Sequence, residues 1–138
     1  MSEVLTRIAN VQQHVGSVAR TTEGYGYKYA TLADVWNLVK DQMASNQLGW
    51  TATTTPHLHE DGDMTSIINE FRVVVYCTDK DDDHISSTYM FEASGAQTVG
   101  SYETYYRRYA LLSILGLTTV LDDDGAASTT PTPITAFK

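Results

Sequence analysis

The chain has 138 residues, of which 42% are apolar, and a formal net charge of -8. This length and apolar content suffice for one hydrophobic core, so a fully disordered chain is excluded, and no apolar run is long enough to span a bilayer. The N-terminus lacks the features of a secretory signal, so we expect a cytoplasmic protein without a membrane partner. The single cysteine, Cys77, has no internal disulfide partner and is predicted to be a small buried side chain.

The acidic residues gather in three short segments, residues 60–63, 79–83 and 122–124. The basic residues are scattered, except for the adjacent Arg107 and Arg108. A surface that binds nucleic acid normally carries an excess of Lys and Arg. The overall charge therefore predicts that any binding of nucleic acid is weak or salt-sensitive rather than tight. Whether the protein binds nucleic acid at all depends on the local distribution of its charges.

Two helices are predicted in the first third of the chain. Residues 2–15 place apolar side chains at helical spacing, with Ser2 available as a cap. We expect this helix to lie on the chain's own core, with a neighbouring subunit as the alternative. A second helix begins at Thr31, where Asp34 completes a variant of the capping box, and ends within residues 46–49. Its apolar stripe is predicted to consist of Leu32, Val35, Trp36, Val39 and Met43.

Three strands and a long helix follow. Strands are predicted at residues 50–58 and 67–78, and Ile85, Tyr89 and Phe91 mark the third. The last helix covers residues 98–115. The predicted fold class is α+β, with two N-terminal helices and a three-stranded antiparallel β-meander followed by a long helix. Residues 1–124 form one core domain, and the Thr- and Pro-rich residues 125–138 are predicted to be a disordered tail.

The last helix has two contrasting faces. At about 100° per residue, one face carries Tyr102, Tyr105, Tyr106 and Tyr109, and the other carries Glu103, Thr104, Arg107 and Arg108. Two interpretations stay open. In the first, the tyrosines pack on the sheet and the arginines form a solvated face that can pair with Glu103. In the second, the arginines bind phosphates while the tyrosines fix the helix or stack on bases.

Two other segments offer groups to a nucleic-acid strand. Tyr25, Tyr27, Lys28 and Tyr29 alternate aromatic rings with a lysine beside two glycines, which let a backbone approach phosphate. Residues 95–101, GAQTVGS, have the glycine spacing of a phosphate loop without its lysine. No ATP site is therefore expected there, although the backbone amides could bind one phosphate of a strand.

Two of the acidic segments contain candidate metal ligands. Residues 79–90 resemble a calcium loop, but His84 and Met90 stand where glycine and a carboxylate ligand are needed, so a polar turn is expected instead. Residues 122–124, three aspartates, could hold a divalent ion, as a metal nuclease requires. His57 and His59 lie on one strand face and are too few for a site. We expect no metal site.

Two stretches resemble the Erf family of phage single-strand DNA annealing proteins. The first is YGYKYATLADVWNLVKDQMASNQLG, residues 25–49, which is similar to the family's aromatic-Lys-Tyr-Ala entry into a helix. The second is GSYETYYRRYALLSILGL with DDDG after it, within residues 100–125, which is similar to its Arg-Arg-Tyr-Ala-Leu helix and acidic end. Together they cover about half of the chain in the expected order.

The resemblance implies ATP-independent binding of single-stranded DNA and annealing of complementary strands in phage recombination, by a β-β-β-α core that forms rings or filaments. No enzyme activity or cofactor is implied, with assistance by Mg²⁺ left open. The tail could bind a host single-strand-binding protein. The positions that match the family's motifs are Lys28, Tyr29, Gly100, Ser101, Thr104, Tyr105, Arg107, Arg108 and Tyr109. The predicted DNA-binding residues are these positions without Tyr109, together with Tyr27 from the aromatic loop. The alternatives are a divalent-metal nuclease acting through residues 122–124 and a structural oligomer without a ligand.

Overall fold

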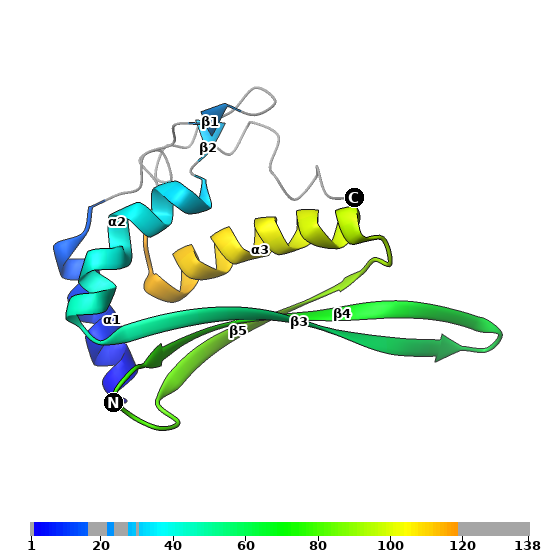
Figure 1. Ribbon diagram of the computed structural model, residues 1–138, viewed down its shortest axis with the longest axis horizontal. Coiled ribbons are helices and arrows are strands. Elements are labelled where there is room, and N and C mark those ends of the chain that lie inside the picture. Colours follow the sequence, from blue (N-terminus) through cyan, green and yellow to red (C-terminus); the bar gives the residue numbers. More distant parts are fainter. Residues whose placement is uncertain (1, 17–21, 24–27, 30, 119–138) are drawn as a thin grey trace.

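Three helices cover one face of a three-stranded antiparallel sheet in the computed structural model of the chain (Figure 1). The structure describes residues 2–16, 22–23, 28–29 and 31–118. The elements are α1 (Glu3–His14), β1 (Thr22–Glu23), β2 (Lys28–Tyr29), α2 (Leu32–Ser45), β3 (Leu48–Asp61), β4 (Met64–Cys77), β5 (His84–Glu92) and α3 (Ala96–Leu115). The sheet has the order β3-β4-β5, and β1 pairs with β2 separately. The predicted α+β class and order of elements are confirmed.

The sheet has one buried face because the side chains of β4 alternate. Phe71, Val73, Val75 and Cys77 are buried beneath the helices, whereas Arg72 points to the opposite face. We call that opposite face, which no described helix covers, the open face. The buried Cys77 confirms its predicted role as a small core residue. Burial also raises the pKa of its thiol.

The helices bury their apolar stripes in the same core. Val4, Ile8 and Val11 of α1 are buried there, so the expectation that this helix lies on the chain's own core is confirmed. α2 contributes Val35, Val39 and Met43 to the same cluster, and the C-terminal half of α3 contributes Leu111 and Leu115. One continuous core therefore fixes all three helices on the sheet.

The hairpin of β3 and β4 is longer than the sequence predicted. The two strands pair from Leu48↔Cys77 to Asp61↔Met64, whereas β5 pairs with β4 only as far as Ile68↔Glu92. Residues 58–67 therefore project beyond the sheet as a two-stranded ribbon, which Figure 1 shows on the right. We call this segment the arm. Gly62 at its turn has a φ of +63°, a conformation that glycine adopts without strain.

Two helix N-termini are capped in different ways. At α2, Thr31 and Asp34 form the predicted capping box. At α1, Ser2 stands at the cap position, but its side chain makes no cap hydrogen bond. The carboxylate of Asp83 instead accepts from the backbone N–H groups of Glu3 and Val4, each at 3.2 Å. A carboxylate at a helix N-terminus also interacts favourably with the helix dipole.

A second contact joins α1 to the same acidic turn. Arg7 donates to both carboxylate oxygens of Asp79, at 2.6 and 3.2 Å, and to the carbonyl of Gln47 at 3.2 Å. The hydrogen bond from Arg7 holds the pKa of Asp79 below its ordinary value. Asp79 and Asp83 therefore attach α1 to the β4–β5 turn. The expectation of a polar turn rather than a calcium loop agrees with these contacts.

Within the described ranges, no helix combines the length and the apolar character needed to cross a membrane.

The Arg7–Asp79 pair predicts how stability depends on pH. Because the folded-state pKa of Asp79 is lowered, its contribution is complete above the unfolded-state pKa and is lost as pH falls through the folded pKa. We expect Asp79→Asn to lower the urea midpoint at pH 7 and to match wild type in strong acid. Asp81→Asn removes the same charge from the same turn and is the control. A constant Asp79→Asn deficit at every pH would contradict the assignment.

Candidate nucleic-acid interface

One side of α3 is fixed to the sheet by stacked aromatic rings. Tyr106 stacks on Tyr89 with ring centroids 4.5 Å apart, and Tyr102 stacks on Phe91 at 4.6 Å. Burial raises the pKa of the Tyr89 hydroxyl, and the neighbouring Tyr106 adds to this shift. The interpretation that the tyrosines pack on the sheet is therefore confirmed for Tyr102 and Tyr106. Their packing fixes the rotation of α3 about its own axis.

The opposite side of the N-terminal half of α3 faces solvent. On a helix wheel, it holds within about 120° a set of residues that we call the α3 strip: Gly100, Ser101, Thr104, Arg107 and Arg108. Ser101 and Thr104 are exposed, and Gly100, Arg107 and Arg108 are half-buried. The fold thus brings five of the sequence-predicted DNA-binding residues to one surface.

The small residues keep the backbone of the α3 strip accessible. A Cβ atom added at Gly100 would meet no other atom within 4 Å, so space lies open above it. The Ser101 hydroxyl donates to the Gln97 carbonyl at 3.1 Å, and the Thr104 hydroxyl donates to the Gly100 carbonyl at 3.0 Å. Since these donors bond the helix itself, we assign the charged contacts of the strip to its two arginines.

Arg108 lies over aromatic rings. Its guanidinium carbon is 5.0 Å from the ring centroid of Tyr109 and 5.9 Å from that of Tyr105. Cation–π contact of this kind holds a guanidinium in place against the rings. Tyr105 is 6% exposed, with its ring 4.5 Å from that of Tyr109. Its predicted part in binding DNA is therefore corrected: it supports Arg108 rather than offering a ring to a base.

Arg107 lies at the edge of the α3 strip that is nearest to β3, about 40° from Glu103 on the helix wheel. One turn earlier, Glu103 accepts a short hydrogen bond from the hydroxyl of Thr54 in β3. The pairing of Glu103 with an arginine, weighed from the sequence, is thus replaced by this bond. Within residues 2–16 and 31–118, no carboxylate lies within ion-pair distance of Arg107. Its charge is therefore not neutralised by a neighbour in the described part of the chain.

The predicted DNA-binding residues nearer the N-terminus, Tyr27, Lys28 and Tyr29, are described only in part. Lys28 and Tyr29 form β2, in which Lys28 pairs with Glu23 and Tyr29 with Thr22. The side chains of Lys28 and Tyr29, and all of Tyr27, lie outside what the structure describes. Residues 122–124 and the predicted tail, 125–138, also lie outside it. The described residues contain no group of three or more His, Cys, Asp or Glu side chains that could hold a metal ion.

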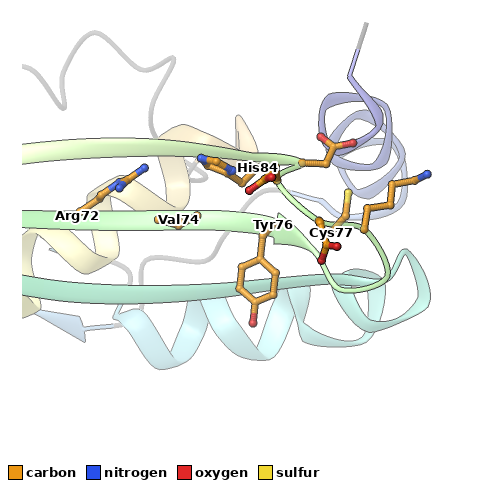
Figure 2. Close-up of a pocket in the computed structure, with 9 residues that line it drawn as sticks. Arg72, Val74, Tyr76, Cys77 and His84 are labelled. Carbon is orange, nitrogen blue, oxygen red and sulfur yellow. The ribbon is translucent and has the colours of Figure 1, made fainter.

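A hollow of about 370 Å³ lies at the end of the sheet opposite the arm, where the open face meets the β4–β5 turn (Figure 2). Arg72 and Lys80 line it together with three aspartates of the turn, Asp81, Asp82 and Asp83. Such mixed charge suits a phosphate chain less well than the α3 strip does. Figure 2 shows Tyr76 reaching across β3, where its ring fills the space that a side chain at position 49 would need.

One exposed aromatic side chain was misassigned from the sequence. Trp36 was placed in the apolar stripe of its helix, but it is 37% exposed, next to the fully buried Val35. The signal was available, because adjacent residues point about 100° apart on a helix. Trp36 therefore belongs to the surface of α2.

The two sides of α3 should respond differently to truncation. Tyr106 contacts the rings of Phe71, Tyr89 and Phe91, so Tyr106→Ala should destabilise the fold by about 2–4 kcal/mol. Thr104→Ala on the exposed strip should change stability by less than about 0.5 kcal/mol. Urea unfolding of both variants measures the difference. Equal losses would mean that the strip is also packed in the folded protein.

The chain was compared with protein-family models, curated proteins and solved structures. No curated protein and no solved structure gave a significant match. The model of the ERF superfamily matches residues 4–135, which is nearly the whole chain and includes α1, the complete sheet and the α3 strip. The chain therefore belongs to the ERF superfamily.

Proposed function

We propose that this protein binds single-stranded DNA without ATP and anneals complementary strands during phage recombination, as an oligomer. The observation that carries the proposal is the α3 strip, in which two arginines and three small residues face solvent. They come from the segment that resembles the Erf-family helix, and the family model covers them. Phosphates bound along this strip would leave base edges free to test a second strand.

The electrostatics suit a site that is weak in one subunit. Two arginines offer few phosphate contacts, and the formal net charge of -8 opposes any approach of DNA. Repetition of the strip along a ring or filament turns a weak site into useful avidity without new contacts. Annealing makes and breaks no covalent bond, so no catalytic residue is required, and Mg²⁺ remains open as an accessory ion.

The arm supports assembly with further copies of the chain. Leu58 is 75% exposed and Met64 is 74% exposed, and the pairing of Leu58 with Ile67 puts Leu58 and Met64 on opposite faces of the arm. A two-stranded ribbon in water is only marginally stable by itself. Contact with a neighbouring subunit would bury both side chains and stabilise the ribbon.

Further parts of the proposal concern the setting. The protein acts in the cytoplasm of a bacterial host, where it meets single strands during phage DNA recombination. A host single-strand-binding protein is the proposed partner of residues 125–138, and pull-down with and without these residues tests that contact. Incubation of labelled strands with Mg²⁺ or Mn²⁺ tests the nuclease alternative, because annealing leaves strand length unchanged.

The arginine pair makes a quantitative prediction. Arg107→Gln with Arg108→Gln should weaken binding to single strands of any sequence, because two phosphate contacts are lost. The log–log slope of affinity against salt should flatten by about 0.7 for each contact. Arg72→Gln, on the open face of the sheet, removes the same charge and should leave binding unchanged. Annealing by the double variant at the wild-type rate would show that the strip is not the DNA site.

The arm makes a second prediction. Leu58→Asn with Met64→Asn should shift the assembly to smaller species in light scattering, since the side chains that a neighbour would cover become polar. The folded subunit should be unaffected, because both positions are largely exposed. Leu5→Asn, at an exposed apolar position of α1, is the matched control. An unchanged particle mass in the double variant would remove the arm from the interface.

A further inference from the structure

We propose that Trp36 of α2 is a base-stacking residue beside Arg107, so that one nucleotide per subunit has its phosphate on the guanidinium and its base on the indole. The inference rests on the proposed function and adds to it an aromatic contact from another helix. Trp36 lies within the first stretch that carries the resemblance, residues 25–49, but it is not one of the predicted DNA-binding residues and does not belong to the α3 strip.

Trp36 is held from below while part of its surface stays open. Its ring centroid lies 6.1 Å from that of Trp50, at an interplanar angle of 57°. Trp50 is half-buried on β3 and packs against both hydrophobic clusters of the core. Trp36 itself remains 37% exposed. A rigid aromatic ring that is supported on one side and open on another can accept a base with little loss of side-chain entropy.

A hydrogen bond between α3 and β3 indicates that Arg107 lies on the same side of the molecule as the tryptophan pair. The helix is attached to the strand at Thr54 by the bond from its hydroxyl to Glu103. Farther along α3, Ile114 packs against the two clusters that Trp50 joins. From Glu103 to Ile114 the helix advances about 16 Å, and from Thr54 back to Trp50 the strand covers about 13 Å. α3 therefore runs back along β3 towards Trp50.

Arg107 lies within this stretch, one turn after Glu103 and at the edge of the α3 strip that is nearest to β3. Trp36 comes from α2, which contacts both α3 and β3. Figure 1 shows α2 and α3 on the same side of the sheet. Exposed apolar residues are common on protein surfaces and mean little when they are scattered. Here the location is what matters, because the exposed indole belongs to the same side of the fold as an arginine without a described carboxylate partner.

The chemistry fits a protein that must accept any sequence. Stacking on an aromatic side chain is tolerant of sequence because every base has a π-face, whereas hydrogen bonds to base edges would select among bases. One stacked base would hold the strand in place on each subunit. The remaining bases would stay free for pairing with a complementary strand.

Two ligands separate stacking from charge: an oligo-dT strand and an abasic phosphodiester strand of equal length. Trp36→Ala should weaken oligo-dT binding by about 5- to 100-fold and leave abasic binding unchanged. Its salt dependence should stay that of wild type. Arg107→Gln should weaken binding of both strands by the same factor. Tyr76→Ala is the matched control, since Tyr76 is also 37% exposed but lies on the open face.

A second measurement uses the tryptophans as reporters. The chain contains two tryptophans, so Trp36→Phe leaves only Trp50. Oligo-dT should quench the fluorescence of wild type and have little effect on Trp36→Phe, which should retain most of the affinity because phenylalanine still stacks. This variant keeps an aromatic ring at the site and so guards against a folding defect in Trp36→Ala.

The outcomes distinguish the two proposals. Equal binding of oligo-dT and abasic strands by wild type, or equal weakening of both by Trp36→Ala, would overturn the stacking role and leave the α3 strip intact. Failure of wild type to bind either strand would instead overturn the proposed function, and the stacking role with it.

Discussion

The stacking of Tyr102 and Tyr106 on the aromatic side chains of β5 determines what α3 can present to solvent. A helix has one rotation about its axis that buries its large rings, and this rotation turns the α3 strip outward. The C-terminal half of the same helix is enclosed, with Ala110, Leu111 and Leu115 buried. The exposed strip therefore stands on a helix whose other end is part of the core. Such anchoring gives a charged surface a defined geometry, which an arginine pair on a loop would lack.

Acidic and basic residues also occupy different parts of the molecule. Two of the clustered acidic residues have structural partners: Asp79 binds Arg7, and Asp83 caps α1. Glu60, Asp61 and Asp63 lie at the turn of the arm. The two acidic clusters that the structure describes therefore lie at the β4–β5 turn and on the arm rather than on the α3 strip. Because exposed charges are screened beyond about 8–10 Å at physiological salt, a local basic strip can act within an acidic protein.

The sequence predicted best the features that depend on local periodicity. The alternation of β4, the capping box of Thr31 and Asp34 and the two faces of α3 are all local patterns, and the structure has each of them. The length of β3 was underestimated because the polar residues 60–63 resemble a turn, although the predicted strand already included Pro56. Proline is tolerated here because β3 is an edge strand, whose outward N–H groups need no partner in the sheet.

Local sequence patterns did not predict the features that depend on tertiary contacts. Asp83 caps α1 although it is 80 positions away from Glu3 in the sequence. A rule based on neighbouring residues could therefore predict Ser2 as the cap but not Asp83. The exposure of two aromatic side chains was also predicted incorrectly. Tyr105 was predicted to contact DNA but is buried, and Trp36 was predicted to be in the core but is exposed. A helix wheel gives the direction of a side chain but not what covers it. The elements that cover a side chain decide whether it is buried.

The division between packed and exposed aromatic rings also bears on how the proposed annealing surface can evolve. Rings that stack inside the fold, such as Tyr106 on Tyr89, are constrained by stability and are unavailable to a strand. A ring at the rim, such as Trp36 above Trp50, contributes less to the core and can respond to a ligand. Binding of any sequence needs only charge and a flat surface. A fold that sets its arginines on one helix and its exposed indole on another can therefore vary the two contributions independently.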